Sequence, residues 1–171
     1  MHLAELYVHP LKSGRGVRHG RAFAGQAGLL GDRIWMLTTP QGEFMTARSH
    51  PMLTQVRVTM IPGALLLQAP GMPLRAAISA VYTQPVPTSV WGDDFAAWHG
   101  DVTVDAWFSE FLGQPCQLLF IGEAPQRQQA TQAAPLGFAD GYPYLLAGEG
   151  SLADLNGQLA VPVSMRHFRP N

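Results

Sequence analysis

Residues 32–48 read DRIWMLTTPQGEFMTAR, and this stretch decides the fold that we expect. Its first eight residues are mostly apolar and β-favouring, residues 40–43 have the composition of a turn, and residues 44–47 are again mostly apolar. The pattern predicts a β-hairpin. In such a hairpin Arg33 begins one strand and Arg48 ends its partner, so we expect both arginines at the same end of a sheet.

The chain on either side of this stretch carries more strand and turn signals. Further strands are predicted at residues 3–8, 56–60 with 64–68, 74–78, 86–91 with 95–98, and 117–121. Residues 101–112 differ, because apolar residues recur there at intervals of three and four, with Asp101 as a cap and Gly113 as a stop. The predicted fold class is therefore mainly β (α+β), an antiparallel β-barrel-like N-terminal domain with one packed helix.

The later part of the chain has a different composition. The glutamine-rich run that ends at Pro135 has no large apolar residue, which predicts a flexible linker. We therefore divide the chain into a barrel domain at 1–121, a linker at 122–135 and a further segment at 136–171. In that segment Ser151 and Asp154 predict a capping box at the start of a helix whose apolar face carries leucines at 152, 155 and 159.

Positive charge is concentrated near the N-terminus. Residues 1–57 hold seven Lys and Arg against three Asp and Glu, whereas residues 58–171 hold four against nine. The asymmetry indicates that the first third faces an anion, with a merely solvated basic surface as the alternative. In the basic loop 12–18, Gly14 and Gly16 let backbone N–H groups approach a ligand closely. The spacing is not that of an ATP-binding P-loop, and a slightly negative total charge does not favour nucleic-acid binding.

Two further features restrict the class of protein. No apolar run reaches the roughly 18 residues that a membrane span needs, and the N-terminus lacks the layout of a signal peptide, so we expect a cytoplasmic protein and no membrane partner. The one cysteine, Cys116, lies in an apolar run, which predicts a buried small residue rather than a metal ligand or nucleophile.

Six motifs, in order over almost the whole chain, give a resemblance to a known family. The chain resembles the MOSC (molybdenum cofactor sulfurase C-terminal) proteins, with their N-terminal β-barrel domain followed by the opening of the MOSC domain, and it is most similar to the amidoxime-reducing branch. The motifs are His9-Pro10-Leu11-Lys12-Ser13, Asp32-Arg33-Ile34-Trp35, Thr46-Ala47-Arg48, Phe138-Ala139-Asp140-Gly141-Tyr142-Pro143, Ser151-Leu152-Ala153-Asp154-Leu155-Asn156 and Phe168-Arg169-Pro170-Asn171.

The resemblance implies a molybdenum-pterin cofactor held between the barrel and the MOSC domain. A phosphate is bound well by a lysine point charge, a planar arginine fork and a hydroxyl or backbone N–H, and the matching residues supply those groups. Arg48 is the candidate for the substrate side of the site. The implied cofactor-binding residues are Lys12, Ser13, Arg33, Arg48, Gly141, Tyr142, Arg169 and Asn171.

The family's activity is implied in the same way. In full form the protein would be a molybdenum-dependent reductase of N-hydroxylated compounds, or a sulfur-carrier relative. Members of the family continue past the position of Asn171 to a molybdenum-ligating cysteine that Cys116 does not match. We therefore expect a truncated and by itself inactive product, with an incomplete MOSC domain at 136–171. The expected partners are a pterin phosphate or other small anion, an electron-transfer protein and the missing MOSC half.

Two other functional classes stay open at this stage. The chain could be a non-catalytic β-barrel module that binds an anion or docks a partner. It could also be a structural remnant with no ligand. Whether the reading frame continues into a segment with a cysteine distinguishes the enzyme class from both.

Overall fold

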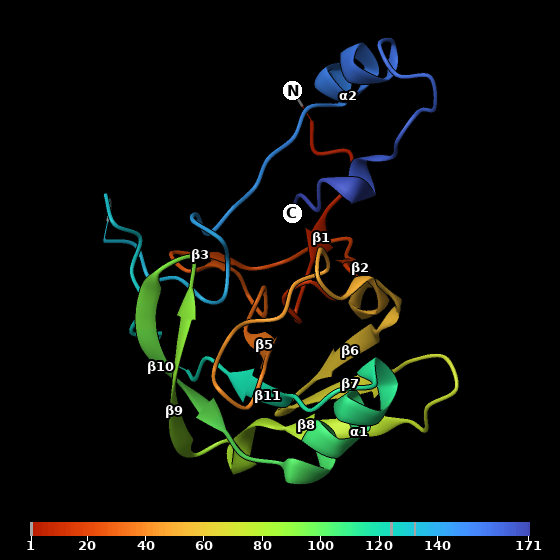
Figure 1. Ribbon diagram of the computed structural model, residues 1–171. Coiled ribbons are helices and arrows are strands. Elements are labelled where there is room, and N and C mark those ends of the chain that lie inside the picture. Colours follow the sequence, from red (N-terminus) through yellow and green to blue (C-terminus); the bar gives the residue numbers. More distant parts are fainter. Residues whose placement is uncertain (1, 124, 132) are drawn as a thin grey trace.

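The computed structural model of the protein describes residues 2–123, 125–131 and 133–171 (Figure 1). Its paired strands are antiparallel and form four small sheets, with strand orders β1-β2, β3-β4, β5-β11-β10-β9 and β6-β7-β8. The strands are β1 (Tyr7–Val8), β2 (Val17–Arg18), β3 (Ala24–Gly25), β4 (Gly28–Leu29), β5 (Trp35–Thr38), β6 (Arg57–Ile61), β7 (Ala64–Gln68), β8 (Arg75–Ile78), β9 (Gln84–Val90), β10 (Asp93–His99) and β11 (Gln117–Phe120). The helices are α1 (Val102–Leu112), α2 (Glu149–Asn156) and the 3-10 turns η1 (Pro51–Gln55), η2 (Ser79–Val81) and η3 (Met165–His167).

The mainly β class is confirmed, and the arrangement is barrel-like without closure. The sheets pack around two apolar clusters, and no closed barrel forms within the described ranges. The largest sheet places β11 between β5 and β10, so Leu118 lies opposite Leu37 and both side chains are fully buried. Successive residues of a strand point to opposite faces, so Leu37 and Leu118 enter one apolar cluster while Met36 and Leu119 enter the other.

The hairpin expected from residues 32–48 forms at its turn and then diverges. A bridge pairs Thr38 with Phe44, and the Met45 amide donates to the carbonyl of Leu37 at 2.8 Å. Beyond this point β5 takes β11 as its regular neighbour. The signal for this long-range pairing is absent from residues 32–48 themselves.

The β9–β10 hairpin has a tighter turn than the sequence predicted. We expected residues 92–94 in the turn, but Asp93 already pairs with Val90, which leaves Trp91 and Gly92 as a two-residue turn. Both have positive φ, at 52° and 90°, as the right-handed twist of paired strands favours. Trp91 is therefore placed on an exposed turn, with 53% of its surface accessible.

Helix α1 confirms the amphipathic prediction. Asp101 accepts a hydrogen bond from the Thr103 amide at 2.9 Å, and Gly113 ends the helix with a left-handed φ of 71°. The helix buries Trp107 and Phe108, together with Val104 and Phe111, in the main core. Truncating a fully buried phenylalanine typically costs about 3–5 kcal/mol, so this face fixes the helix firmly.

The predicted capping box at Ser151 is wrong. Helix α2 begins after Gly148, which places Ser151 inside the first turn, and no side chain caps the helix. A reciprocal capping pair joins Ser164 and His167 instead, at η3. No residue of α2 is buried and Leu159 is 39% exposed, so the expected apolar face is unpartnered within the described chain. Figure 1 shows α2 set apart from the sheets.

Residues 136–139 are buried, and they anchor the later chain to the core. Phe138 is fully buried in the second core cluster, and its amide donates to the Arg33 carbonyl at 2.7 Å. Residues 124 and 132 of the predicted linker lie outside the described residues. In the rest of that run Arg127 is buried, and a bridge joins Gln128 to Pro135. The division at 121 and 135 stays a prediction.

Candidate functional site

Lys12 lies in the loop that follows β1, and its buried side chain reaches the distant residues 138–140. Its Nζ donates to the Phe138 carbonyl at 2.7 Å and to Asp140 Oδ1 at 2.6 Å. Burial lowers the pKa of Lys12, although Asp140 opposes the shift. Burial alone would raise the pKa of Asp140, but the charge and hydrogen bond of Lys12 lower it overall. The ammonium is desolvated and paired with a carboxylate whose side chain is 65% exposed.

Arg33 connects the N-terminal third to the C-terminal residues. Its guanidinium donates to Asp32, to Asn171 Oδ1 at 3.3 Å and to the Arg169 carbonyl at 3.0 Å. The Asp32 side chain is almost completely buried and also accepts from the His9 amide at 2.6 Å. A buried carboxylate therefore holds both Arg33 and the start of the basic loop in place.

Arg169 and Asn171 complete this arrangement from the opposite end of the sequence. Arg169 donates to the Gly14 carbonyl, and Asn171 donates through Nδ2 to the Tyr7 carbonyl at 3.3 Å. Burial, and then the neighbouring charge of Arg33, lower the pKa of Arg169 to about 10, so the group is cationic at neutral pH. Three cations predicted from the sequence, at 12, 33 and 169, are thereby gathered around Asp32 and Asp140.

The other predicted site residues lie at the rim of this cluster. The Arg48 guanidinium lies 5.1 Å from the ring centre of Trp91, whose Nε1 donates to Asp140 Oδ1 at 2.9 Å. Arg48 is thus joined to Lys12 through Trp91 and Asp140, and it does not share the partners of Arg33. The expected position of the two arginines at one sheet end stays a prediction.

Gly141 and Tyr142 follow Asp140 on the surface. Nothing lies within 4 Å of a Cβ built on Gly141, and Tyr142 is 61% exposed. Ser13 is half-buried beside Lys12. The structure therefore places every predicted site residue in or beside the cluster, while their roles toward a cofactor stay predictions.

Several residues that build the cluster were not among the predicted site residues. Asp140 belongs to one of the six motifs, but its pairing with Lys12 spans 128 positions and leaves no local signal. Trp91 ends the strand predicted at 86–91, and the structure places it in an exposed turn instead. The Gly that follows it, in a hairpin turn, is the only sequence signal that points to this placement.

Backbone conformation marks the same region. Four of the five non-glycine residues with positive φ in the described ranges border the cluster: Ser13, Arg33, Trp91 and Arg169. Such conformations cost on the order of 1 kcal/mol or more each and persist where the surroundings impose them. Their concentration around the gathered cations supports a functional role for this region.

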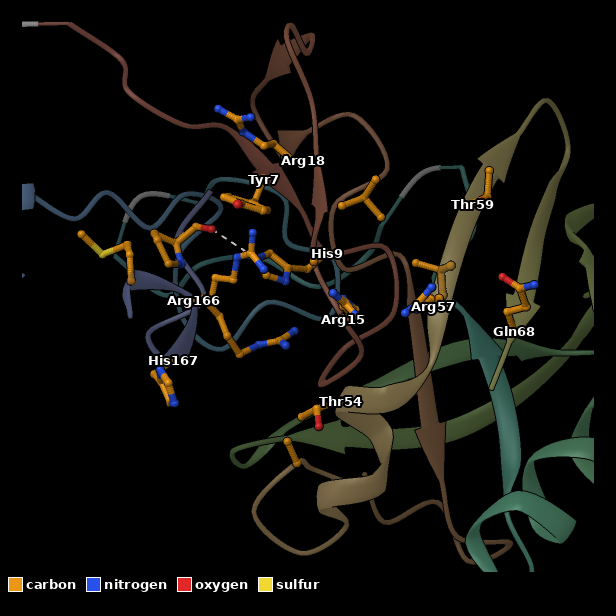
Figure 2. Close-up of a pocket in the computed structure, with 17 residues that line it drawn as sticks. Tyr7, His9, Arg15, Arg18, Thr54, Arg57, Thr59, Gln68, Arg166 and His167 are labelled. Carbon is orange, nitrogen blue, oxygen red and sulfur yellow. Dashed lines mark hydrogen bonds between the residues drawn. The ribbon is translucent and has the colours of Figure 1, made fainter. Parts of the chain in front are cut away.

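A cavity of about 850 Å³ opens beside the cluster (Figure 2). His9 and Arg169 line it, whereas Lys12, Ser13 and Arg33 do not. The Nε2 of His9 donates to the Pro170 carbonyl at 3.1 Å. Burial, followed by the charges of Arg169 and Arg33, lowers the pKa of His9 to about 4, so the imidazole is neutral at pH 7.

The structure also bears on metal binding. Within residues 2–123, 125–131 and 133–171, no three His, Cys, Asp or Glu side chains are grouped so that they could hold a metal ion. Cys116 is buried as expected, and burial raises the pKa of its thiol to about 11.

In the same described part of the chain, no helix combines the length and the apolar character that crossing a membrane requires.

The sequence of the chain is similar to those of proteins in one known family. The sequence profile of the MOSC N-terminal beta barrel domain matches residues 1–115. Human mitochondrial amidoxime-reducing component 1 is 30% identical over 188 residues, covering 99% of this chain and 54% of that protein. Rat mitochondrial amidoxime reducing component 2 is 28% identical, and the match covers 99% of this chain and 55% of that protein. A rice molybdenum cofactor sulfurase is 27% identical, and the match covers 100% of this chain and 24% of that protein. The chain thus spans about half the length of the amidoxime-reducing relatives that it matches.

Proposed function

The chain belongs to the MOSC N-terminal beta barrel domain family, and from this membership we propose that it supplies the anion-holding part of a molybdenum-pterin cofactor site. In this proposal Lys12, Ser13, Arg33, Arg169 and Asn171 bind the phosphate of the pterin. Arg48, Gly141 and Tyr142 border the cofactor or its substrate.

The convergence of the two chain ends is the observation that carries the proposal. Arg33 contacts Arg169 and Asn171 across 136 and 138 positions, and Lys12 reaches Asp140 across 128. The clustered cations fit a phosphate, because guanidinium and ammonium donors match its oxygens. We therefore assign the phosphate of the cofactor to this cluster.

Each side chain has a distinct part in the proposed site. Lys12 provides a point charge, and its partner Asp140 has a side chain that is 65% exposed, so an anion can approach the pair from solvent. Arg33 and Arg169 provide guanidinium forks, fixed by Asp32 and by the Gly14 carbonyl. The molybdenum-pterin group, when bound, supplies redox chemistry that amino-acid side chains do not perform.

We extend the proposal to the whole protein through its relatives. Their names include amidoxime-reducing components and molybdenum cofactor sulfurases. A reductase of N-hydroxylated compounds, or a sulfur-carrier relative, is therefore the proposed activity of the protein that contains this chain. The proposal includes a barrel domain at 1–121, a MOSC segment from 136, an electron-transfer partner and a cytoplasmic location.

Binding of a pterin phosphate to the chain tests this proposal. We expect 6-hydroxymethylpterin phosphate, followed by its fluorescence, to bind with a Kd of roughly 1 mM, since part of the cofactor cavity is enough only for weak capture. Lys12→Ala combined with Arg33→Ala should weaken binding at least about tenfold. Asp140→Asn should strengthen it a few-fold, because the competing carboxylate on Lys12 is removed.

Two controls make the result specific. Arg21→Ala removes an exposed cation away from the cluster and should leave the Kd unchanged. The unphosphorylated 6-hydroxymethylpterin should bind much more weakly than its phosphate. Equal binding of both pterins, or an unchanged Kd in the Lys12 and Arg33 double variant, would contradict the proposal.

One observation favours a second candidate function, a non-catalytic anion-binding module. The cavity beside the cluster is lined by several cations and by no carboxylate side chain. A module of this kind would bind an anion without any pterin. It predicts that simple phosphates bind as well as the pterin phosphate.

A further inference from the structure

The cavity of about 850 Å³ is strongly basic, and Arg169 is the one proposed cofactor-binding residue in its described lining. Five arginines line it, at positions 15, 18, 57, 166 and 169, and no Asp or Glu does. Figure 2 shows Arg15, Arg57 and Arg166 on three different segments around the cavity: the loop after β1, the start of β6, and η3. Like charges gathered without a counterion raise the local potential and favour an anionic occupant.

Three of these arginines have no counterion in the described part of the chain, and one of them, Arg166, has its guanidinium 5.8 Å from the ring centre of Tyr7. No described carboxylate forms an ion pair with Arg15, Arg57 or Arg166, whereas Arg18 pairs with Glu5 at 3.5 Å. The Arg15 amide donates to the Val56 carbonyl at 3.3 Å, so Arg15 and Arg57 start from adjacent backbone. Two guanidinium groups in this position can hold one tetrahedral oxyanion.

The inner wall of the cavity has unused polar groups. Tyr7 Oη and His9 Nδ1 are buried and have no hydrogen-bond partner in the described part of the chain, although both side chains line the cavity. Buried polar atoms without partners are rare and call for an explanation. Both atoms have almost no surface exposed to solvent, so they lie behind the wall and do not contact a ligand directly.

The size of the cavity indicates more than a bare ion. A volume of about 850 Å³ lies within the range of small-molecule sites, roughly 300–1,000 Å³. Val58 and Met165 add apolar surface beside the polar Thr54 and Gln68. We propose that the cavity binds a soluble phosphate monoester, with its phosphate on Arg15, Arg57 and Arg166 and its organic part against Tyr7 and Val58.

Titration of the intact chain with phenyl phosphate, followed by backbone amide shifts, tests this site. We expect saturable shifts at Arg15, Arg57 and Arg166, a Kd that rises with ionic strength, and no such shifts with phenol. Arg57→Gln and Arg166→Gln should each raise the Kd by about five- to tenfold, as the loss of a charge-assisted contact implies. Arg21→Gln removes the same charge from a surface outside the cavity and should leave the Kd unchanged.

The outcome is distinguishable from that of the cofactor proposal. Lys12 does not line the cavity, so Lys12→Ala should abolish the amide shifts that pterin phosphate causes at Arg33 and Asn171, and should keep the phenyl phosphate shifts at Arg57 and Arg166. A parallel titration with vesicles that contain phosphatidic acid tests whether the cavity binds the phosphate of a lipid instead. Absence of shifts at the three arginines, equal weakening by Arg21→Gln, or binding only to the vesicles would overturn the proposal.

Discussion

Replacing Arg127 by alanine is expected to lower the free energy of unfolding by about 3 kcal/mol, because a buried cation with four partners is lost. Arg127 donates to the carbonyls of Gly137 and Ala139, to that of Asp140 at 3.0 Å, and to Asp93 Oδ2 at 2.8 Å. These bonds fasten the segment that pairs with Lys12. The substitution should therefore loosen the candidate site as well as the fold.

Denaturant unfolding and hydrogen exchange measure the two effects. We expect faster exchange at the Phe138 amide, whose partner is the Arg33 carbonyl, while the amides of α1 are less affected under native conditions. Arg21→Ala serves as the control, because that side chain is exposed. If Arg127→Ala changed stability no more than Arg21→Ala, residues 136–140 would not be fastened in this way.

Acidification is expected to destabilise the junction between the two chain ends through His9. The pKa of His9 is lowered from 6.5 to about 4 in the folded chain. Above pH 6.5 the imidazole is neutral in both states, and its full contribution to stability is present. As the pH falls from 6.5 toward 4 the unfolded chain takes up a proton that the folded chain excludes, so up to about 3 kcal/mol is lost.

The test compares unfolding at several pH values. His9→Gln removes the titrating group, while the side-chain amide of the new glutamine can still donate to the Pro170 carbonyl. The stability of this variant should therefore fall less between pH 6.5 and 4 than that of the unchanged chain. His2→Gln alters an exposed histidine and should keep the original pH profile. Parallel profiles for His9→Gln and the unchanged chain would show that His9 is not held neutral.

Local signals predicted much of the fold. The α1 boundaries followed from apolar periodicity together with Asp101 and Gly113, and the β6–β7 hairpin followed from its Pro-Gly turn. These elements are set by residues close together in the sequence. The family motifs extended the prediction to the site residues, which the structure gathers from positions 12 to 171.

What local patterns could not predict depends on long-range contacts. Arg127 lies in a glutamine-rich run that resembles a linker, yet its partners lie 10 to 34 positions away. Ser151 has the spacing of a capping box, but α2 starts earlier because Gly148 takes the capping position. The basic cavity combines Arg15, Arg57 and Arg166, which share no motif and no spacing.

The proposed function requires the two ends of the chain to form one anion site. Titration with inorganic phosphate, followed by amide shifts in an Arg57→Gln, Arg166→Gln background that silences the cavity, measures whether they do. We expect residues 12–16, Arg33, Arg169 and Asn171 to shift together with one Kd of roughly millimolar size, and these shifts to disappear with Lys12→Ala and Arg33→Ala. If the N-terminal amides shifted while Arg169 and Asn171 did not, or if all of them stayed still, the two ends would not form one site.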